Sequence, residues 1–218
     1  MMQAKISVEV FFDFICPWCL IGKRHLHAAI EKLKQTHPQI QVAIKWRGVQ
    51  LLPSIPVDGI PFKAFYLQRL GTTTAVRMRQ EQVRQAAKAV GVDIDFERIP
   101  RMPNTAKAHS LLSNALQLAA PSQYDLLLEG IFSAYFHHSE NISDPAVLQK
   151  IATYCGYAEA PIKALLDEPN TPFISVNTGG KGVPYFVFDG AFALAGAQPA
   201  EMLYQALLEA FEAQGAEV

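Results

Sequence analysis

The sequence predicts an α/β domain that is interrupted by a large, all-helical insertion. First, a β-rich segment over residues 6–15 is followed by a helical pattern over 18–35 and a second β-rich segment over 41–48. Second, the patterns from residue 62 to about 167 are helical, and β-rich segments return only after them. Third, 50% of the residues are hydrophobic and 18% are charged, which is enough apolar surface for a full core.

The first elements are expected to form a strand–helix–strand unit. The segment 6–15 alternates at its start and is continuously apolar later, as in a strand buried on both faces. The helix follows Pro17, because proline is well tolerated at the first helical position. Its apolar positions at helical spacing are Leu20, Leu26, Ile30 and Leu33. Val42, Ile44 and Trp46 then alternate in a second strand, so we expect a parallel βαβ unit.

A series of helices follows a proline-rich connection over residues 53–61. Capping residues and glycines mark where these helices start and stop. Asn104 is expected to cap one helix, and Ser143-Asp144 another that begins at Pro145. The expected helices cover residues 62–70, 74–90, 104–119, a segment from 122 onward, 145 to about 155, and 161–166.

The end of the chain returns to β structure. Two short strands, over residues 185–188 and 191–195, flank Asp189-Gly190, which is typical of a hairpin turn. A final helix is expected to open in the segment Gly196–Pro199 and to run through Phe211.

This order of elements places the helical block inside one α/β domain. We assign residues 1–52 and 171–218 to that domain and residues 53–170 to the insertion. We expect a central mixed sheet flanked by helices, with both ends of the chain contributing to it. An insertion of this size also offers a candidate face for a homodimer.

Charge and hydropathy exclude several classes of function. The formal net charge is −1 and the isoelectric point about 6.6, whereas a nucleic-acid-binding protein should carry a basic patch. The apolar segment 8–22 contains Glu9 and Asp13 and is too short to span a bilayer. It also lacks the basic start and the cleavage site of a secretory signal. We therefore expect a cytoplasmic protein that binds neither nucleic acid nor membranes.

Chemistry is concentrated in the motif Cys16-Pro17-Trp18-Cys19, which lies where the first strand turns into a helix. Unpaired backbone N–H groups at a helix N-terminus favour negative charge, so we expect the Cys16 thiolate to be stabilised there. Cys19 lies on the next turn and can reach back to form a disulfide with Cys16. We expect Cys155, on the apolar face of its helix, to be inert core.

Two other interpretations of the cysteine pair stay open. Such a pair can be half of a zinc site, but a second Cys-x-x-Cys motif is absent. Cys155, His109 and His137-His138 do not have the spacing of zinc ligands. The two cysteines can also be buried residues without a chemical role. The position of the pair between a strand and a helix favours a redox dithiol without a metal.

Two motifs occur in the order and at the separation of a known family. The first runs from Phe11 to Lys23 around the cysteine pair, and the second comprises Gly182–Phe188 and Gly196–Pro199. Over nearly the whole chain they resemble the FrnE-like branch of the DsbA-like thioredoxin-fold oxidoreductases. That family has a helical insertion in the middle of a thioredoxin fold, so the resemblance implies this fold. The 2-hydroxychromene-2-carboxylate isomerases and kappa-class glutathione transferases are related to it.

The resemblance also implies roles for individual residues. Cys16 would be the attacking cysteine and Cys19 the resolving one. Pro184 would have a cis peptide bond after Val183 and would face the cysteines. Its backbone groups would then bind an extended substrate.

Further candidate residues follow from the same resemblance. Pro17-Trp18 would line the substrate site, with a packed aromatic as the alternative for the tryptophan. Asn104 and His109 begin an insertion helix of the kind that relatives direct toward the cysteines, with a plain helix cap as the alternative for the asparagine. Ala197-Gln198 corresponds to a region that holds glutathione in the kappa-class transferases, with an ordinary helix start as the alternative.

One position departs from the pattern of many thioredoxin-fold enzymes. Those enzymes keep a buried acid six residues before the first cysteine as a proton relay, and this chain has Val10 there. Asp13 lies closer to Cys16, and we interpret it as a structural residue at the end of the strand.

These observations predict a cytoplasmic thiol–disulfide oxidoreductase or isomerase. Its partner would be a thiol- or disulfide-containing protein or glutathione, and it would need no tightly bound cofactor beyond glutathione as a co-substrate. The alternative is a glutathione-dependent isomerase or transferase, although those enzymes typically have serine at the first motif position. A third interpretation is a zinc-stabilised or chaperone-like binding module.

Overall fold

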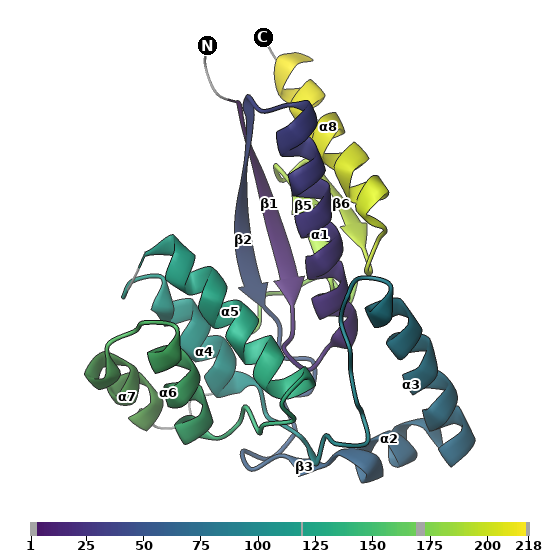
Figure 1. Ribbon diagram of the computed structural model, residues 1–218, viewed down its shortest axis with the longest axis vertical. Helices are drawn as coiled ribbons and strands as arrows, with labels where there is room; N and C mark the ends of the chain where they lie inside the picture. The colour runs from purple at the N-terminus through teal and green to yellow at the C-terminus, as the bar shows by residue number, and fades with distance from the viewer. Residues whose placement is uncertain (1–3, 119, 169–172, 217–218) are drawn as a thin grey trace. The chain divides into compact units, whose positions relative to one another are not determined.

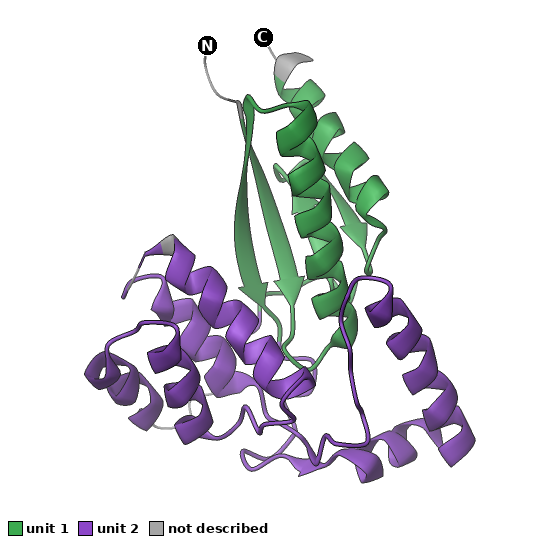
Figure 2. Cartoon of the chain, in the orientation of Figure 1, with its two compact units in different colours: residues 1–49, 176–218 green, residues 50–175 purple. Residues whose placement is uncertain are grey.

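The computed structural model describes residues 4–118, 120–168 and 173–216. It divides into two compact units: unit 1 comprises residues 1–49 and 176–218, and unit 2 comprises residues 50–175 (Figure 2). The first boundary therefore falls after residue 49, where we predicted residue 52. The predicted second boundary, after residue 170, lies outside the described residues.

Unit 1 contains a four-stranded sheet with the order β2-β1-β5-β6. The strands are β1 (Ala4–Phe12), β2 (Ile40–Gly48), β5 (Tyr185–Phe188) and β6 (Phe192–Ala195). β1 and β2 are parallel, as predicted, whereas β5 is antiparallel to both of its neighbours. The helices α1 (Pro17–Thr36) and α8 (Ala200–Ala216) lie side by side against this sheet (Figure 1). This mixed sheet flanked by helices confirms the predicted α/β class.

A tight turn at Asp189-Gly190 joins β5 to β6. The φ angles of the two residues are 48° and 73°, and positive φ at both central residues is what a type I′ hairpin turn requires. The Asp189 carboxylate also accepts a hydrogen bond from the backbone N–H of Ser7 at 2.7 Å. The predicted hairpin is therefore confirmed, and its turn is tied to β1.

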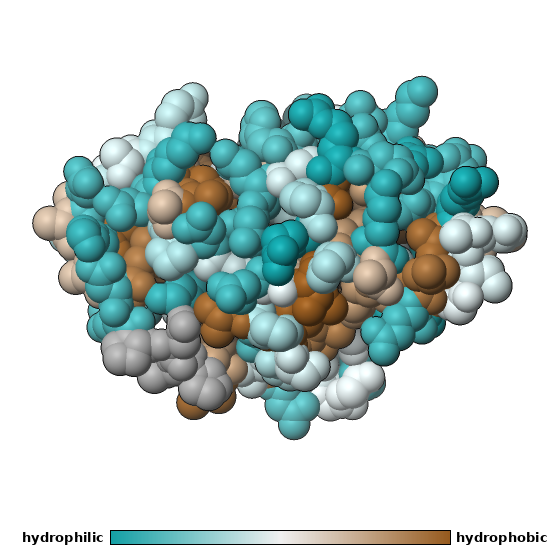
Figure 3. Space-filling model, turned by 90° about the horizontal axis from the view of Figure 1, so that it is seen from below, coloured by the Kyte–Doolittle hydropathy of each residue, from teal (hydrophilic) through white to brown (hydrophobic). Residues whose placement is uncertain are grey.

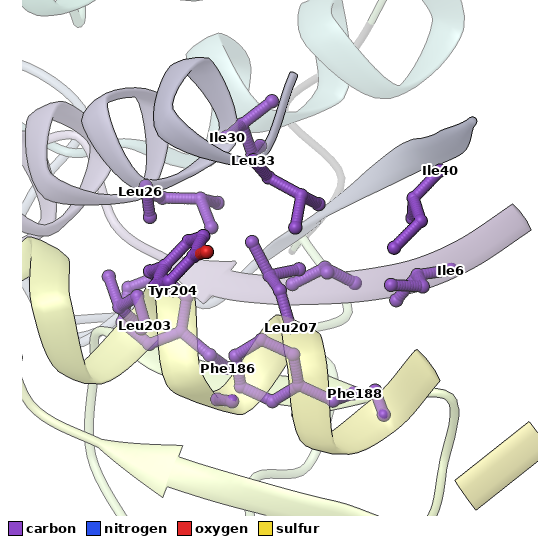
Figure 4. Packing of buried hydrophobic residues seen from close by; sticks show 14 of the residues in the cluster. Ile6, Leu26, Ile30, Leu33, Ile40, Phe186, Phe188, Leu203, Tyr204 and Leu207 are labelled. Atoms are coloured by element: carbon purple, nitrogen blue, oxygen red, sulfur yellow. The ribbon is translucent and has the colours of Figure 1, made fainter. Parts of the chain in front are cut away.

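The core of unit 1 lies between the sheet and its two helices (Figure 4). Alternate residues of β1 point into it, while α1 and α8 each contribute one apolar face. The predicted strand positions Val42, Ile44 and Trp46 pack against its edge. Its best-buried large side chains are Ile6, Leu26, Leu33, Phe186, Phe188, Leu203 and Leu207.

The predicted boundaries of two elements in unit 1 are wrong. β1 ends at Phe12 rather than at residue 15, because the chain turns there and the N–H of Cys16 donates to the carbonyl of Asp13 at 3.1 Å. α8 begins at Ala200 and extends beyond Phe211. It does not open at Gly196, because the φ angle of that residue is 81°, outside the helical region.

Unit 2 is mainly helical, as predicted. Its described helices are α2 (Phe62–Leu70), α3 (Thr73–Lys88), α4 (Ala106–Ala115), α5 (Pro121–Phe136), α6 (Pro145–Tyr154) and α7 (Glu159–Asp167). The predicted cap of α6 is confirmed, since the Asp144 carboxylate accepts from the N–H of Ala146 at 2.8 Å. α4 ends earlier than predicted, and residue 119 lies outside the described residues.

A short antiparallel pair in unit 2 was not predicted. β3 (Ile60–Pro61) pairs with β4 (Arg101–Met102). Strands this short show no periodicity, and a proline counts against a strand in a sequence pattern.

Some large apolar side chains of unit 2 are exposed, among them Met78, Leu116, Leu126 and Tyr154. On the face shown in Figure 3, hydrophobic residues lie between hydrophilic ones. Among the described residues, no helix combines the length and the apolar character that crossing a membrane requires.

Candidate active site

The cysteine pair lies at the N-terminus of α1, as predicted. Cys16 is the N-cap residue, with extended backbone angles, and Pro17 occupies the first turn, where its missing N–H needs no partner. The N–H of Cys19 donates to the carbonyl of Cys16 at 3.0 Å. The Cys16 sulfur therefore lies at the end of the helix where the backbone dipoles favour negative charge.

The two thiols of the pair differ in their surroundings. Both are free, and Cys16 is 8% exposed while Cys19 is 2% exposed. Burial raises the pKa of the Cys19 thiol well above its usual range, and the neighbouring Cys16 raises it further, through a hydrogen bond and through the negative charge of its thiolate form. A hydrogen bond from the backbone of Asp13 acts in the opposite direction. Cys19 is therefore a neutral thiol that donates to Cys16, and Cys16 is the more accessible of the two.

The segment before β5 brings a proline to the dithiol. The peptide bond between Val183 and Pro184 is cis. The Cys16 thiol donates to the Val183 carbonyl, with the sulfur 3.7 Å from the oxygen. Pro184 is buried and Val183 is half-buried. Two segments that are 167 residues apart in the sequence thus meet at the reactive sulfur.

Gly22 permits this close approach. A Cβ atom at this buried position of α1 would lie 3.1 Å from Cγ of Pro184 and 3.1 Å from Cζ of Phe186. Contacts of that length are tighter than nine in ten real Cβ contacts, so both neighbours would have to shift by a few tenths of an ångström. Because Gly22 has no side chain, β5 and Pro184, which precedes it, can pack closely against α1.

The segment before α8 is also tied to this proline. The N–H of Gly196 donates to the carbonyl of Pro184 at 2.8 Å. Ala197 and Gln198 are half-buried, and the Gln198 side chain donates to the carbonyl of Ala195 at 2.6 Å. Their part in binding glutathione stays a prediction.

The two residues between the cysteines, Pro17 and Trp18, are half-buried. Part of each surface is therefore open to solvent next to the dithiol. Their part in substrate binding also stays a prediction.

Asn104 has a structural role within unit 2. Its side-chain oxygen accepts hydrogen bonds from the N–H of Ala106 and the side chain of Gln50, both at 2.9 Å. Its side-chain nitrogen donates to the carbonyl of Ile55 at 2.6 Å. The N-cap residue of α4 is Thr105 rather than Asn104 as predicted, but the Asn104 side chain lies directly before it, accepts from the first N–H of the helix and joins three segments of the insertion.

His109 is buried within unit 2, at 1% exposed. Its ring stacks on Phe173 with centroids 4.9 Å apart. Asn104 and Phe173 line a cavity of about 410 Å³ in the same unit. Because the dithiol belongs to unit 1, the predicted contact of Asn104 and His109 with substrate stays a prediction.

Two charged residues that flank the cysteine motif in the sequence are buried, which was not predicted. Asp13 is 0% exposed and lies in a turn beyond the strand, and Lys23 is 4% exposed on α1. The burial of Lys23 could have been predicted from the sequence, because this residue falls at helical spacing with the buried residues Cys19, Leu26 and Ile30. The burial of Asp13 could not have been predicted in this way, because it depends on the tertiary fold and not on a local pattern.

The described parts of the chain contain no group of three or more His, Cys, Asp or Glu side chains that could hold a metal ion. The third cysteine, Cys155, is buried at the C-terminal end of α6 and 8% exposed. Burial raises the pKa of its thiol.

Alkylation should distinguish the three thiols. Because burial raises the pKa of Cys19 and Cys155, both stay protonated at a pH where an ordinary thiol begins to ionise. At pH 8 we expect iodoacetamide to modify Cys16 at least roughly tenfold faster, since each pKa unit changes the thiolate fraction about tenfold. Peptide mass spectrometry measures the three rates, and unfolding in guanidinium chloride should make them similar. Faster modification of Cys19 would contradict this assignment.

The raised thiol pKa values also affect the stability of the fold. The native state holds these two protons more tightly than the unfolded chain does. Their contribution to the free energy of unfolding is therefore complete below the usual thiol pKa and is lost as the pH rises above it.

Comparisons with known proteins agree with this geometry. The model of the DSBA-like thioredoxin domain matches residues 7–208. The uncharacterized protein YwbO of Bacillus subtilis is 25% identical over 162 residues, which are 74% of this chain and 72% of that protein. A probable DsbA oxidoreductase from Streptomyces coelicolor is 26% identical, with a TM-score of 0.81 over 95% of this chain and 90% of the other. The cytosolic disulfide reductase DsbM from Pseudomonas aeruginosa is 19% identical, with a TM-score of 0.60 over 93% and 97%.

Proposed function

The chain belongs to the DSBA-like thioredoxin domain family, and from this premise we propose that it is a thiol–disulfide oxidoreductase of the FrnE-like branch. Its redox group is the Cys16–Cys19 dithiol. Cys16 attacks a substrate disulfide, and a mixed disulfide forms as one substrate thiolate leaves. Cys19 then attacks the Cys16 sulfur, which releases the second substrate thiol and leaves a Cys16–Cys19 disulfide. The observation that carries the proposal is the contact of the two free thiols at the start of α1.

The surroundings of Cys16 support a site for an extended substrate. The Val183 carbonyl lies beside the Cys16 sulfur and can also accept a hydrogen bond from a substrate backbone N–H. Pro17 and Trp18, between the two cysteines, are half-buried and so leave some apolar surface exposed. We propose that Pro17, Trp18, Val183 and Pro184 form the substrate site.

We propose the cytoplasm as the compartment of this protein, as for the disulfide reductase DsbM, which has the same fold. In a reducing compartment the dithiol is kept reduced, so the direction would be reduction or isomerisation of substrate disulfides. The partner would be a disulfide-containing protein or glutathione, the latter also as the co-substrate that returns the enzyme to its reduced form. No further cofactor is needed for this cycle, and a homodimer through the insertion stays part of the proposal.

The thiol pair favours this dithiol cycle over a glutathione-dependent isomerase or transferase. In that alternative, glutathione would bind near Ala197 and Gln198, and Cys19 would have no chemical role. The hydrogen bond from the Cys19 thiol to Cys16 instead supports a cycle in which both sulfurs react. If the Cys19→Ser variant still turns over a chromene carboxylic acid, that result would favour the alternative.

Equilibration with glutathione tests the proposed function. In mixtures of reduced and oxidised glutathione, we expect a disulfide between Cys16 and Cys19, identified by peptide mass spectrometry. Cys155→Ser should behave as the unmodified chain does. The midpoint gives the direction, since a potential near about −270 mV marks a reductant and one near about −120 mV an oxidant. A stable glutathione adduct with no Cys16–Cys19 disulfide would reject the proposal.

A further inference from the structure

Gly22 separates α1 from the segment that carries the Val183 carbonyl. It is buried on α1, about one helical turn after Cys19. A Cβ atom there would lie 3.1 Å from Cγ and 3.5 Å from Cβ of Pro184, and 3.1 Å from Cζ of Phe186. The backbone of Gly22 is helical, which is a conformation that any L-residue adopts. The missing side chain therefore matters at this position for packing and not for backbone conformation.

The two neighbours of Gly22 have little room to retreat. Phe186 is 0% exposed in the core of unit 1 and is paired with Val10 in the sheet. Pro184 is buried, and its carbonyl accepts the N–H of Gly196 at 2.8 Å. Close-packed protein interiors transmit a local strain instead of absorbing it. A Cβ atom at Gly22 should therefore displace Pro184 together with the residue before it.

The Val183 carbonyl would be affected by such a displacement, because it belongs to the peptide group that Pro184 completes. Its oxygen lies 3.7 Å from the Cys16 sulfur, so it faces the reactive atom. A shift of a few tenths of an ångström changes the length and the direction of a hydrogen bond to this oxygen, and hydrogen bonds weaken steeply when they are misaligned. The same holds for a substrate N–H that donates to this carbonyl.

We propose that Gly22 is a positioning residue for polypeptide substrates: its lack of a side chain places the Val183 carbonyl where it accepts a backbone N–H of a chain whose disulfide reaches Cys16. The inference rests on the proposed function, in which that carbonyl is part of the substrate site. Gly22 does not touch the substrate and acts through Pro184. A small disulfide without peptide groups does not use this carbonyl, so Gly22 favours polypeptide disulfides over such compounds.

Gly22→Ala tests this inference in the Cys19→Ser background, where the mixed disulfide accumulates. The variant should fold, because alanine is a better helix former than glycine. We expect the concentration of a peptide disulfide that gives half of the maximal rate of mixed-disulfide formation to rise at least about threefold, which is within the range of one ordinary hydrogen bond. The maximal rate should change little, because Cys16 keeps its place at the start of α1. The rate with the aromatic disulfide dithiobis-nitrobenzoate, which has no peptide group, should also change little.

A methylated peptide measures the hydrogen bond itself. The probe is the same peptide disulfide with methyl groups on the backbone amides on both sides of its cysteine, so that these amides cannot donate. Methylation should raise the half-saturating concentration at least about threefold for the chain that keeps Gly22, and clearly less for Gly22→Ala. Such a non-additive response shows that the two changes affect one interaction. A purely structural role of Gly22 would not produce it.

Gly130→Ala is the matched control. Gly130 lies within α5 of unit 2, whereas the dithiol belongs to unit 1. A Cβ atom at Gly130 would lie 2.9 Å from Cγ2 of Ile151, so this variant also adds a methyl group at a tightly packed helical glycine. We expect it to react with both disulfides, and to respond to methylation, as the chain that keeps both glycines does.

The outcomes separate this inference from the proposed function. If no chain forms a mixed disulfide with either compound, the proposed function fails. If mixed disulfides form and Gly22→Ala saturates at the same peptide concentration as before, the inference fails, because the neighbours have absorbed the methyl group. Equal slowing with the peptide and the aromatic disulfide would show a general disturbance of the cysteine site and would also overturn it. So would a chain with Gly22 that does not respond to methylation, a result that requires no variant of Gly22 to fold.

Discussion

Cys19→Ser is expected to stop the catalytic cycle after its first step. Cys16 keeps its position at the start of α1 and its contact with the Val183 carbonyl, so attack on a substrate disulfide continues. A serine hydroxyl does not displace a thiolate from the mixed disulfide. We expect a covalent complex with a peptide disulfide to accumulate and turnover to fall at least roughly 100-fold, as when one member of a catalytic unit is removed.

Non-reducing electrophoresis and intact-mass measurement detect this complex. Cys16→Ser should form none, because the remaining thiol of the pair is 2% exposed and holds its proton. Cys155→Ser is the matched control, since it removes a buried thiol of unit 2 and should leave turnover unchanged. Equal trapping by Cys16→Ser and Cys19→Ser would show that the roles of the two sulfurs are assigned wrongly.

Phe188→Ala should cause the largest loss of stability in unit 1. Phe188 is 0% exposed in the core of this unit, and its ring stacks on Phe192 with centroids 5.2 Å apart. Truncating a buried phenylalanine removes apolar contacts and leaves a cavity, which costs about 3–5 kcal/mol. We expect the free energy of unfolding to fall by that amount.

Urea denaturation followed by tryptophan fluorescence measures this loss. Both tryptophans of the chain, Trp18 and Trp46, belong to unit 1, so the signal reports on the unit that carries the change. Met202→Ala is the control, since Met202 lies on α8 of the same unit and is 48% exposed. Its effect should stay within about 0.5 kcal/mol. A loss below about 1 kcal/mol in Phe188→Ala would mean that the sheet and helices do not depend on this contact.

Much of the fold could be predicted because local patterns and tertiary structure agree. The alternation in β2 and the helical spacing in α1 follow from which residues face one core. The turn at Asp189-Gly190 depends on two residues that accept positive φ, so its sequence alone identifies it. The redox motif could also be placed at the start of α1 from local sequence, because Cys-Pro at the end of a β-rich run indicates a helix start.

The rest depends on contacts between distant segments. No local pattern connects Val183 and Pro184 to Cys16, and their proximity was expected only from a family resemblance. Asp13 directly follows the last residue of β1, but its complete burial was not predicted, because it depends on the turn that leads from Phe12 into α1. The pair β3 and β4 was missed because two residues per strand contain no periodic signal.

The bare backbone at Gly22 has a consequence for protein engineering. A side chain at this position would press on both Pro184 and Phe186, so a substitution here requires both of them to shift by a few tenths of an ångström. Grafting the four-residue motif alone onto another scaffold would transfer the sulfurs without the gap into which the proline fits. A transplant should therefore include the chain through Gly22 on one side and the stretch from Val183 to Phe186 on the other.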